Sequence, residues 1–299
     1  MLLLQNSFVL LTGLPVWVGY IFFFLIGSVI GSFLNVVIHR VPLEKSIIFP
    51  NSACPKCKEN IKPYDNIPII SWLILGGKCR KCKNPISLRY PAIELLTALL
   101  FTLTFWQIEL TVFLPVALIF VASMISLIFI DAEHMILPNV ITYPLLVFAL
   151  FVRILYPIIF ASTDYFQDLN IYPLTLLQEQ PVWLVSLVGA ILGGLVGGGS
   201  LWLVGEIWKR LRGVDAMGLG DVKMMFGVGA LLGWRLAFLS IFIGAFTGAV
   251  AGVLVIARSK EKDMQAQIPF GIFLGIGSIM ALLFGEQMIS WYIETFILR

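Results

Sequence analysis

The chain consists largely of long apolar runs separated by short polar segments. Two of the runs are short, and the last is long enough to contain a break at Gly285-Glu286-Gln287. The pattern predicts an all-α, polytopic membrane protein with about eight transmembrane helices. Runs suited to a hydrocarbon core about 30 Å thick occur at 15–38, 91–107, 111–130, 137–160, 182–208, 216–233, 236–257 and 268–297.

Composition and charge agree with this prediction and orient the chain. The sequence is 59% hydrophobic and only 12% charged, unlike a soluble domain of 299 residues. Lysine and arginine gather in segments 39–90, 209–215 and 258–263, whereas segment 161–180 has acidic residues and no cation. Cytoplasmic loops retain positive charge, so we expect the N-terminus outside and the three basic segments in the cytoplasm. The net charge is only +3 and no nucleic-acid motif is present, so we expect lipid and no nucleic acid as partner.

Segment 39–90 is the only polar stretch long enough to fold outside the bilayer, and it contains all four cysteines. About fifty residues rarely form a sufficient core without a metal or disulfides. Two Cys-x-x-Cys pairs, 21 residues apart, have the spacing of a four-thiolate zinc site. The alternative is two disulfides or idle thiols, but disulfides do not persist in the cytosol. We therefore expect structural zinc on Cys54, Cys57, Cys79 and Cys82, and domains at 1–38 (first span), 39–90 (zinc-binding) and 91–299 (transmembrane domain).

Two aspartates stand at the predicted cytoplasmic ends of apolar runs. Asp131 follows the third run, and Asp221 closes Gly218-Leu219-Gly220-Asp221 at the start of the sixth. A carboxylate at a membrane border indicates a functional site. Two carboxylates that share a water are suited to acid–base hydrolysis, since like charges close together do not both ionise. Interfacial anchoring or helix capping is the alternative for each acid taken singly. We expect Gly218 and Gly220 to give the backbone before Asp221 unusual freedom.

Other catalytic arrangements have little support. The sequence has neither Gly-x-Ser-x-Gly nor His-Glu-x-x-His, and we interpret His39 and His134 as interfacial residues. Lys223 is expected to extend toward the interface. The glycine pairs in run 182–208 suit helix packing better than phosphate binding, because no Lys-Ser or Lys-Thr follows them. A proton-coupled transporter using the paired aspartates, and a zinc-stabilised scaffold without catalysis, remain as alternatives to a hydrolase.

Several motifs together resemble the type IV prepilin peptidases, which are Gly-x-Gly-Asp aspartyl proteases of the membrane. Asp131 and Asp221 match the two catalytic aspartates of that family. Asn139 stands where the family often has aspartate, which argues against position 139 as the catalytic acid. The other matching segments are Gly31-Ser32-Phe33-Leu34-Asn35-Val36-Val37-Ile38-His39-Arg40, Cys54 to Cys82 with Asp65-Asn66-Ile67-Pro68 and Ser71-Trp72-Leu73, Arg89-Tyr90-Pro91 with Glu94, and Ile268-Pro269-Phe270-Gly271.

The resemblance implies a defined reaction and location. Family members remove the basic leader of type IV prepilins and type II secretion pseudopilins, cutting after a glycine that precedes a hydrophobic helix. Many then methylate the new N-terminus with S-adenosylmethionine. We therefore expect a multi-pass protein of the bacterial inner membrane whose active site faces the cytoplasm. No nucleoside-binding pattern is present in the sequence, so the expected methyl transfer and its donor rest on the resemblance alone.

Overall fold

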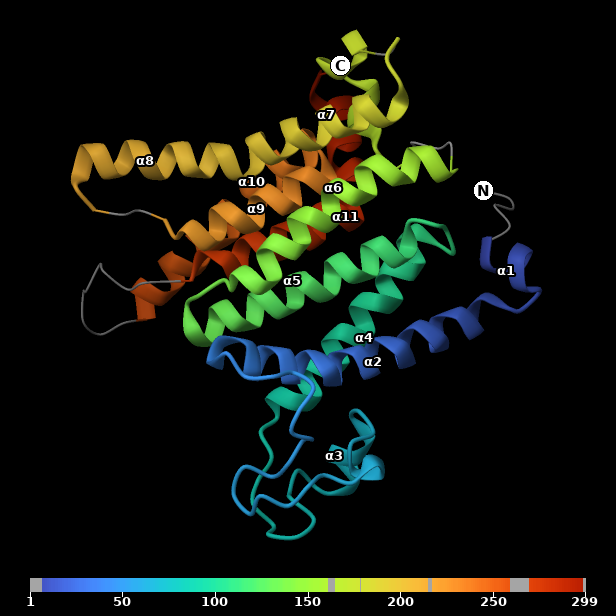
Figure 1. The fold of residues 1–299 in the computed structure, drawn as a ribbon, viewed down its shortest axis with the longest axis vertical. Coiled ribbons are helices and arrows are strands. Elements are labelled where there is room, and N and C mark those ends of the chain that lie inside the picture. The colour runs from blue at the N-terminus through green and yellow to red at the C-terminus, as the bar shows by residue number, and fades with distance from the viewer. Residues whose placement is uncertain (1–6, 161–164, 178, 215–216, 259–268, 298–299) are drawn as a thin grey trace. The chain divides into compact units, whose positions relative to one another are not determined.

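The computed structural model describes residues 7–160, 165–177, 179–214, 217–258 and 269–297, and the regular elements of this part of the chain are all helices (Figure 1). Contacts divide the chain into two units, 1–126 and 127–299, with the boundary inside one helix. Asp164, Lys260 and Lys262, which we used to orient the loops, lie outside the described residues.

The first unit is built on two long helices that pack side by side. After α1 (Ser7–Thr12), helix α2 (Val16–Arg40) packs against α4 (Arg89–Ile108). A Cβ added to Gly27 would lie 2.7 Å from the Cα of Ala98, and one added to Gly31 would lie 2.7 Å from the Cα of Glu94. The two glycines therefore allow the backbones to touch. The unit closes with the first part of α5 (Leu114–His134).

The polar segment between α2 and α4 contains only short helices, which are η1 (Val41–Leu43), η2 (Pro63–Asp65) and α3 (Ile70–Ile74). Glu94, buried on α4, accepts a hydrogen bond of 2.7 Å from the backbone N–H of Ile69. Ile69 has a φ of 63°, which is unfavourable for a β-branched residue. The Glu94 carboxylate thus fixes the start of α3 against the first turns of α4.

The second unit contains the end of α5 and the remaining helices. Helix α7 continues through a π-helical turn, η5, into α8, so that one apolar helix runs from Val182 to Arg212. The helices that follow α5 are α6 (Asn139–Phe160), η3 (Gln167–Asn170), η4 (Leu174–Leu177), α7 (Val182–Gly194), η5 (Leu195–Gly199), α8 (Ser200–Arg212), α9 (Leu219–Leu232), α10 (Trp234–Arg258), α11 (Phe270–Tyr292) and η6 (Ile293–Ile297).

Seven helices in the described part of the chain are long and apolar enough to cross a membrane. The exception among the predicted spans is 216–233, where α9 has 14 residues. At a rise of 1.5 Å per residue, this helix is roughly 21 Å long, too short to cross alone. Most of its residues are buried, and it contacts α6, α7, α10 and α11. The short run is therefore a core helix of the second unit, and Asp221 lies in its first turn.

Glycines bring α9 against its neighbour, as expected of packing positions. Gly193 of α7 and Gly229 of α9 face each other so closely that a Cβ on either would collide with the backbone oxygen of the other. The predicted break at Gly285-Glu286-Gln287 is wrong, because α11 continues through these residues. A Cβ on Gly285 would lie 2.5 Å from Leu236, and Glu286 pairs with Arg235 of α10 at 3.4 Å. Glu286 therefore helps to pack α11 against α10.

A buried ion pair ties together three parts of the second unit. Arg153 of α6 is 0% exposed and binds Asp168 of η3 through two hydrogen bonds, of 3.0 and 2.6 Å. Its guanidinium also lies over the ring of Phe166, at 4.4 Å. Gly233, at φ 82° between α9 and α10, leaves room for the Asp168 side chain, since a Cβ would lie 2.6 Å from the carboxyl carbon. We did not predict this pair from the sequence, although an arginine inside an apolar run was its signal.

Candidate functional site

Asp131 lies near the end of α5, with 6% of its surface exposed. The helix ends within one turn, where Met135 takes a left-handed φ of 53° and its N–H bonds the Asp131 carbonyl at 2.9 Å. The carboxylate oxygen Oδ2 accepts a hydrogen bond of 3.2 Å from the backbone N–H of Ile272, in the first turn of α11. The helix terminus thus fixes the orientation of this acid.

Asp221 lies in the first turn of α9, with 8% of its surface exposed. Gly218 precedes the helix in extended conformation, and its carbonyl accepts the Asp221 N–H at 3.1 Å. The acid therefore belongs to a helix start that is enclosed by other helices of the same unit. Burial of a carboxylate in this setting is unfavourable, so its presence indicates a functional site.

The two carboxylates converge on Gly271 at the start of α11. The position that a Cβ would take on Gly271 lies 2.7 Å from Asp131 Oδ2 and 3.0 Å from Asp221 Oδ1. These oxygens can be no farther apart than the sum of the two distances, so one water is able to bridge them. Gly271 is a third component of the site. In the sequence it stands out only as part of a matching motif, and its role becomes visible only from the packing of α11 against the two aspartates.

The glycines before Asp221 act differently from our expectation of backbone freedom, which is wrong for both. Gly218 has a φ of −70° and Gly220 lies inside α9, so neither needs the left-handed region. A Cβ on Gly220 would instead lie 2.8 Å from the Cβ of Leu137. Gly220 therefore lets α9 approach the turn between α5 and α6, which brings Asp221 toward Asp131.

Lys223 has a partner that sequence analysis did not foresee. Its ammonium donates a hydrogen bond of 2.9 Å to the side-chain oxygen of Asn139, and it lies 5.1 Å from the ring centre of Tyr143. The contact joins α9 to α6 at the surface of the unit. His39 and His134 are both exposed, as expected of interfacial residues.

The four cysteines of the first unit form a separate cluster. All four are free thiols, and their sulfur atoms lie within 4.8 Å of one another. The Cys54 and Cys82 sulfurs are 3.8 Å apart. Zn–S bonds of about 2.3 Å in a tetrahedron place sulfurs about 3.8 Å apart. The cluster therefore has the donor set and the spacing of a four-thiolate metal site.

Two matched turns build this cluster. In the first, the Cys54 N–H bonds the Glu59 carbonyl at 2.9 Å, and Lys58 has a φ of 58°. In the second, the Cys79 N–H bonds the Asn84 carbonyl at 2.8 Å, and Lys83 has a φ of 57°. Backbone N–H groups of Cys57 and Lys56 lower the pKa of the Cys54 thiol to about 6, whereas burial and the neighbouring thiols raise the pKa of Cys57 to about 11. A thiol that ionises readily is suited to metal binding.

Comparison with known proteins places the two aspartates and the four cysteines in matched segments. Residues 25–108 match the bacterial peptidase A24 N-terminal domain, and residues 118–253 match the type IV leader peptidase family. A prepilin leader peptidase/N-methyltransferase from Pseudomonas aeruginosa is 34% identical over 90% of this chain and 92% of its own length. The chain belongs to the type IV leader peptidase family.

Other relatives agree with this assignment to the type IV leader peptidase family. Proteins with the same name are 34% identical in Aeromonas hydrophila, over 95% of this chain and 97% of theirs, and 36% identical in Neisseria gonorrhoeae, over 79% and 82%. No solved structure matches the chain. The resemblance inferred from the motifs is confirmed. A peptidase family favours hydrolysis over the proton-coupled transporter that the paired aspartates left open.

Proposed function

We propose that this chain removes the basic leader of type IV prepilins and pseudopilins, and then methylates the new N-terminus with S-adenosylmethionine as donor. Its full-length relatives are named for both activities. The observation that carries the peptidase assignment is the convergence of two buried aspartates on Gly271. Asp131 and Asp221 are the proposed catalytic residues.

The proposed hydrolysis uses the two carboxylates in different forms. The charged carboxylate accepts a proton from the bridging water, whose oxygen then bonds the scissile carbonyl carbon. The neutral carboxylic acid donates its proton to the leaving nitrogen as the C–N bond breaks. The Ile272 N–H fixes one carboxylate throughout, and Gly271 leaves the space for water and the scissile bond. Because the pair titrates together, neither role is assigned to one residue.

The proposed orientation places this chemistry at the cytoplasmic border of the inner membrane, with the N-terminus outside. Asp131 lies where α5 ends, and α6 and the helix Val182–Arg212 then cross the membrane outward and back, so α9 begins with Asp221 at the same face. A substrate keeps its basic leader on the cytoplasmic side by the same charge rule, and its hydrophobic helix enters the lipid. Its scissile bond then lies at the depth of the aspartates.

The proposed metal is zinc, with a structural role. Four thiolates fill a tetrahedral coordination sphere and leave no position for water or substrate. Cys54, Cys57, Cys79 and Cys82 would hold the ion and so fix the fold of the proposed domain 39–90, between the first span (1–38) and the catalytic domain (91–299). S-Adenosylmethionine, when bound, supplies a methyl group on a positively charged sulfur, which the freed amine accepts.

Incubation with a purified prepilin in detergent tests the proposal. The account predicts a product shortened by the leader, and mass spectrometry gives both the cleavage position and any added methyl group. A transporter or a zinc-stabilised scaffold leaves the substrate at full length. An intact prepilin after incubation with correctly folded, metal-containing protein contradicts the proposed peptidase.

A further inference from the structure

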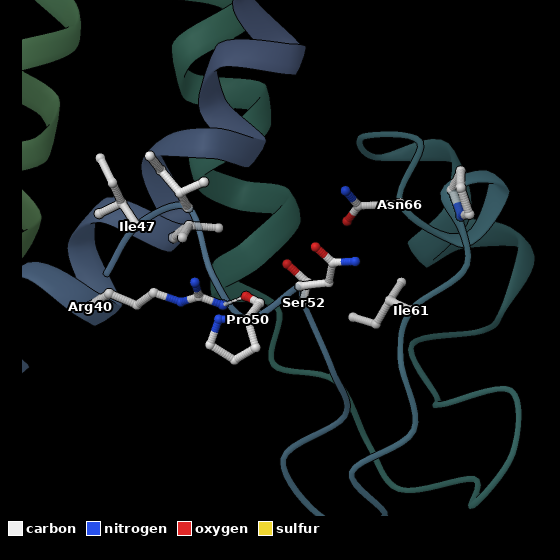
Figure 2. Close-up of a pocket in the computed structure, with 10 residues that line it drawn as sticks. Arg40, Ile47, Pro50, Ser52, Ile61 and Asn66 are labelled. Atoms are coloured by element: carbon white, nitrogen blue, oxygen red, sulfur yellow. Dashed lines mark hydrogen bonds between the residues drawn. The ribbon is translucent and has the colours of Figure 1, made fainter. Parts of the chain in front are cut away.

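A pocket of about 400 Å³ opens beside the cytoplasmic end of α2, and the proposed hydrolysis does not use it. It lies within the first unit, between the last turns of α2 and two stretches of the cysteine-bearing segment. Figure 2 shows Asn66 and Ile61 directed toward Ser52, with Arg40 on the opposite side. The lining residues are Val36, Arg40, Ile47, Ile48, Pro50, Asn51, Ser52, Ile61, Pro63 and Asn66.

The pocket combines apolar walls with a few polar groups, as small-molecule sites of about 300–1,000 Å³ do. Among the described residues, the side chains of Asn51, Ser52 and Asn66 have no hydrogen-bond partner. The Arg40 guanidinium donates to the carbonyls of Ser46 and Pro50, at 3.0 and 2.7 Å, and thereby fixes the loop that forms one wall. Arg40 is the one charged residue among those that line the pocket.

The metal-binding turn supports the opposite wall. The Ile61 N–H bonds the Ser52 carbonyl at 2.8 Å, and the Cys54 N–H bonds the Glu59 carbonyl at 2.9 Å. Ser52 and Ile61 therefore stand directly beside the first cysteine turn. A metal ion on the four cysteines would hold these two segments in place and would make this wall of the pocket rigid.

We infer that this pocket binds S-adenosylmethionine, an inference that rests on the proposed methyl transfer. Its isoleucine side chains are suited to the faces of adenine and ribose. The free amide and hydroxyl groups of Asn51, Ser52 and Asn66 are suited to the polar edges of the nucleoside and to the amino group. Arg40 supplies the positive charge that attracts the carboxylate of the methionine portion.

A lipid phosphate is the competing occupant, since an arginine at the end of a span also attracts anionic headgroups. The two ligands differ in what the pocket must provide. A phosphate needs the charge of Arg40 alone, whereas an adenosyl group also needs Asn66 and the apolar space beside Ile61. Variants at these two positions therefore distinguish the occupants.

Equilibrium binding of labelled S-adenosylmethionine to the purified full chain tests the inference. Asn66→Leu removes a donor and an acceptor, and Ile61→Trp fills the apolar space. We expect each to weaken binding at least about tenfold while the protein retains its metal. Asn60→Leu makes the same change as Asn66→Leu at an exposed position of this segment outside the pocket, and it should bind as the unchanged protein does.

Photo-cross-linking of the labelled donor locates the site independently of activity. We expect label in peptides from residues 46–66, and competition by S-adenosylhomocysteine. Wild-type affinity in both Asn66→Leu and Ile61→Trp, label elsewhere, or displacement by glycerol phosphate alone overturns the inference. If the unchanged protein methylates cleaved substrate in those cases, only the location is wrong; if it neither binds the donor nor methylates, the methyl-transfer part of the proposed function also fails.

Discussion

Replacing Gly271 with alanine should disable the proposed catalytic pair without unfolding the protein. The added Cβ would lie 2.7 Å from Asp131 Oδ2 and 3.0 Å from Asp221 Oδ1, whereas ordinary contacts begin at 3.4 Å. Both carboxylates must therefore retreat by several tenths of an ångström, and the methyl group occupies the space between them. A misplacement of about 1 Å in catalytic geometry costs about a hundredfold in rate. We expect kcat/KM for leader cleavage to fall about a hundredfold.

The stability of the Gly271→Ala protein should change little, or should rise although its activity falls. Alanine is favoured over glycine inside a helix by about 1 kcal/mol, and Gly271 lies in the first turn of α11. That gain offsets the cost of crowding two side chains. The unfolding midpoint in detergent should therefore stay near that of the unchanged protein while activity is lost.

Gly218→Ala is the matched control, although Gly218 belongs to the Gly-x-Gly-Asp motif. Its Cβ would lie 3.4 Å from Asp221 Oδ2, an ordinary contact, and its φ of −70° suits alanine. We expect this variant to keep most of its activity in a quantitative prepilin cleavage assay. Equal cleavage rates for Gly271→Ala and the unchanged protein would refute the convergence of the two acids at α11.

Two further predictions concern the metal site and the buried ion pair. Elemental analysis should find one zinc per chain, and Cys79→Ser should lower this content because it removes one of four thiolates; an active preparation without metal would contradict the structural site. Asp168→Asn leaves the charge of buried Arg153 without its partner, which costs about 3–5 kcal/mol. Its thermal midpoint should therefore fall well below that of Asp65→Asn, which breaks a pair whose arginine, Arg80, is half exposed. Equal midpoints would contradict the stabilising role of the Arg153–Asp168 pair.

Much of the fold followed from the sequence because long apolar runs and cysteine spacing are local signals. The boundary of α9 did not, since an apolar run alone does not separate a short core helix from a membrane span. Two ion pairs between separate segments also could not be predicted from the sequence. Glu286 pairs with Arg235 and stays within α11, and Arg153 binds Asp168 from another segment. The sequence alone does not show which residues pair in either case.

The candidate site was predictable in part for the same reason. Both aspartates stood out at the borders of apolar runs, so their positions required no structure. Gly271 did not stand out, because its role depends on three helices that meet. The use of Gly220 for packing against Leu137 likewise depends on a contact between distant segments. Local patterns identified the acids, and tertiary packing identified the residue between them.

Cleavage of a purified prepilin by Asp221→Asn tests the central claim most directly, with Asp131→Asn as its partner. Asparagine keeps the shape of the side chain and removes proton transfer, so both variants should insert in the membrane and leave the prepilin uncut. Asn139→Ala, which removes only the contact to Lys223, should keep most of its activity. Loss of leader removal in both aspartate variants is the result that the account predicts. Cleavage at the unchanged rate by either variant contradicts it.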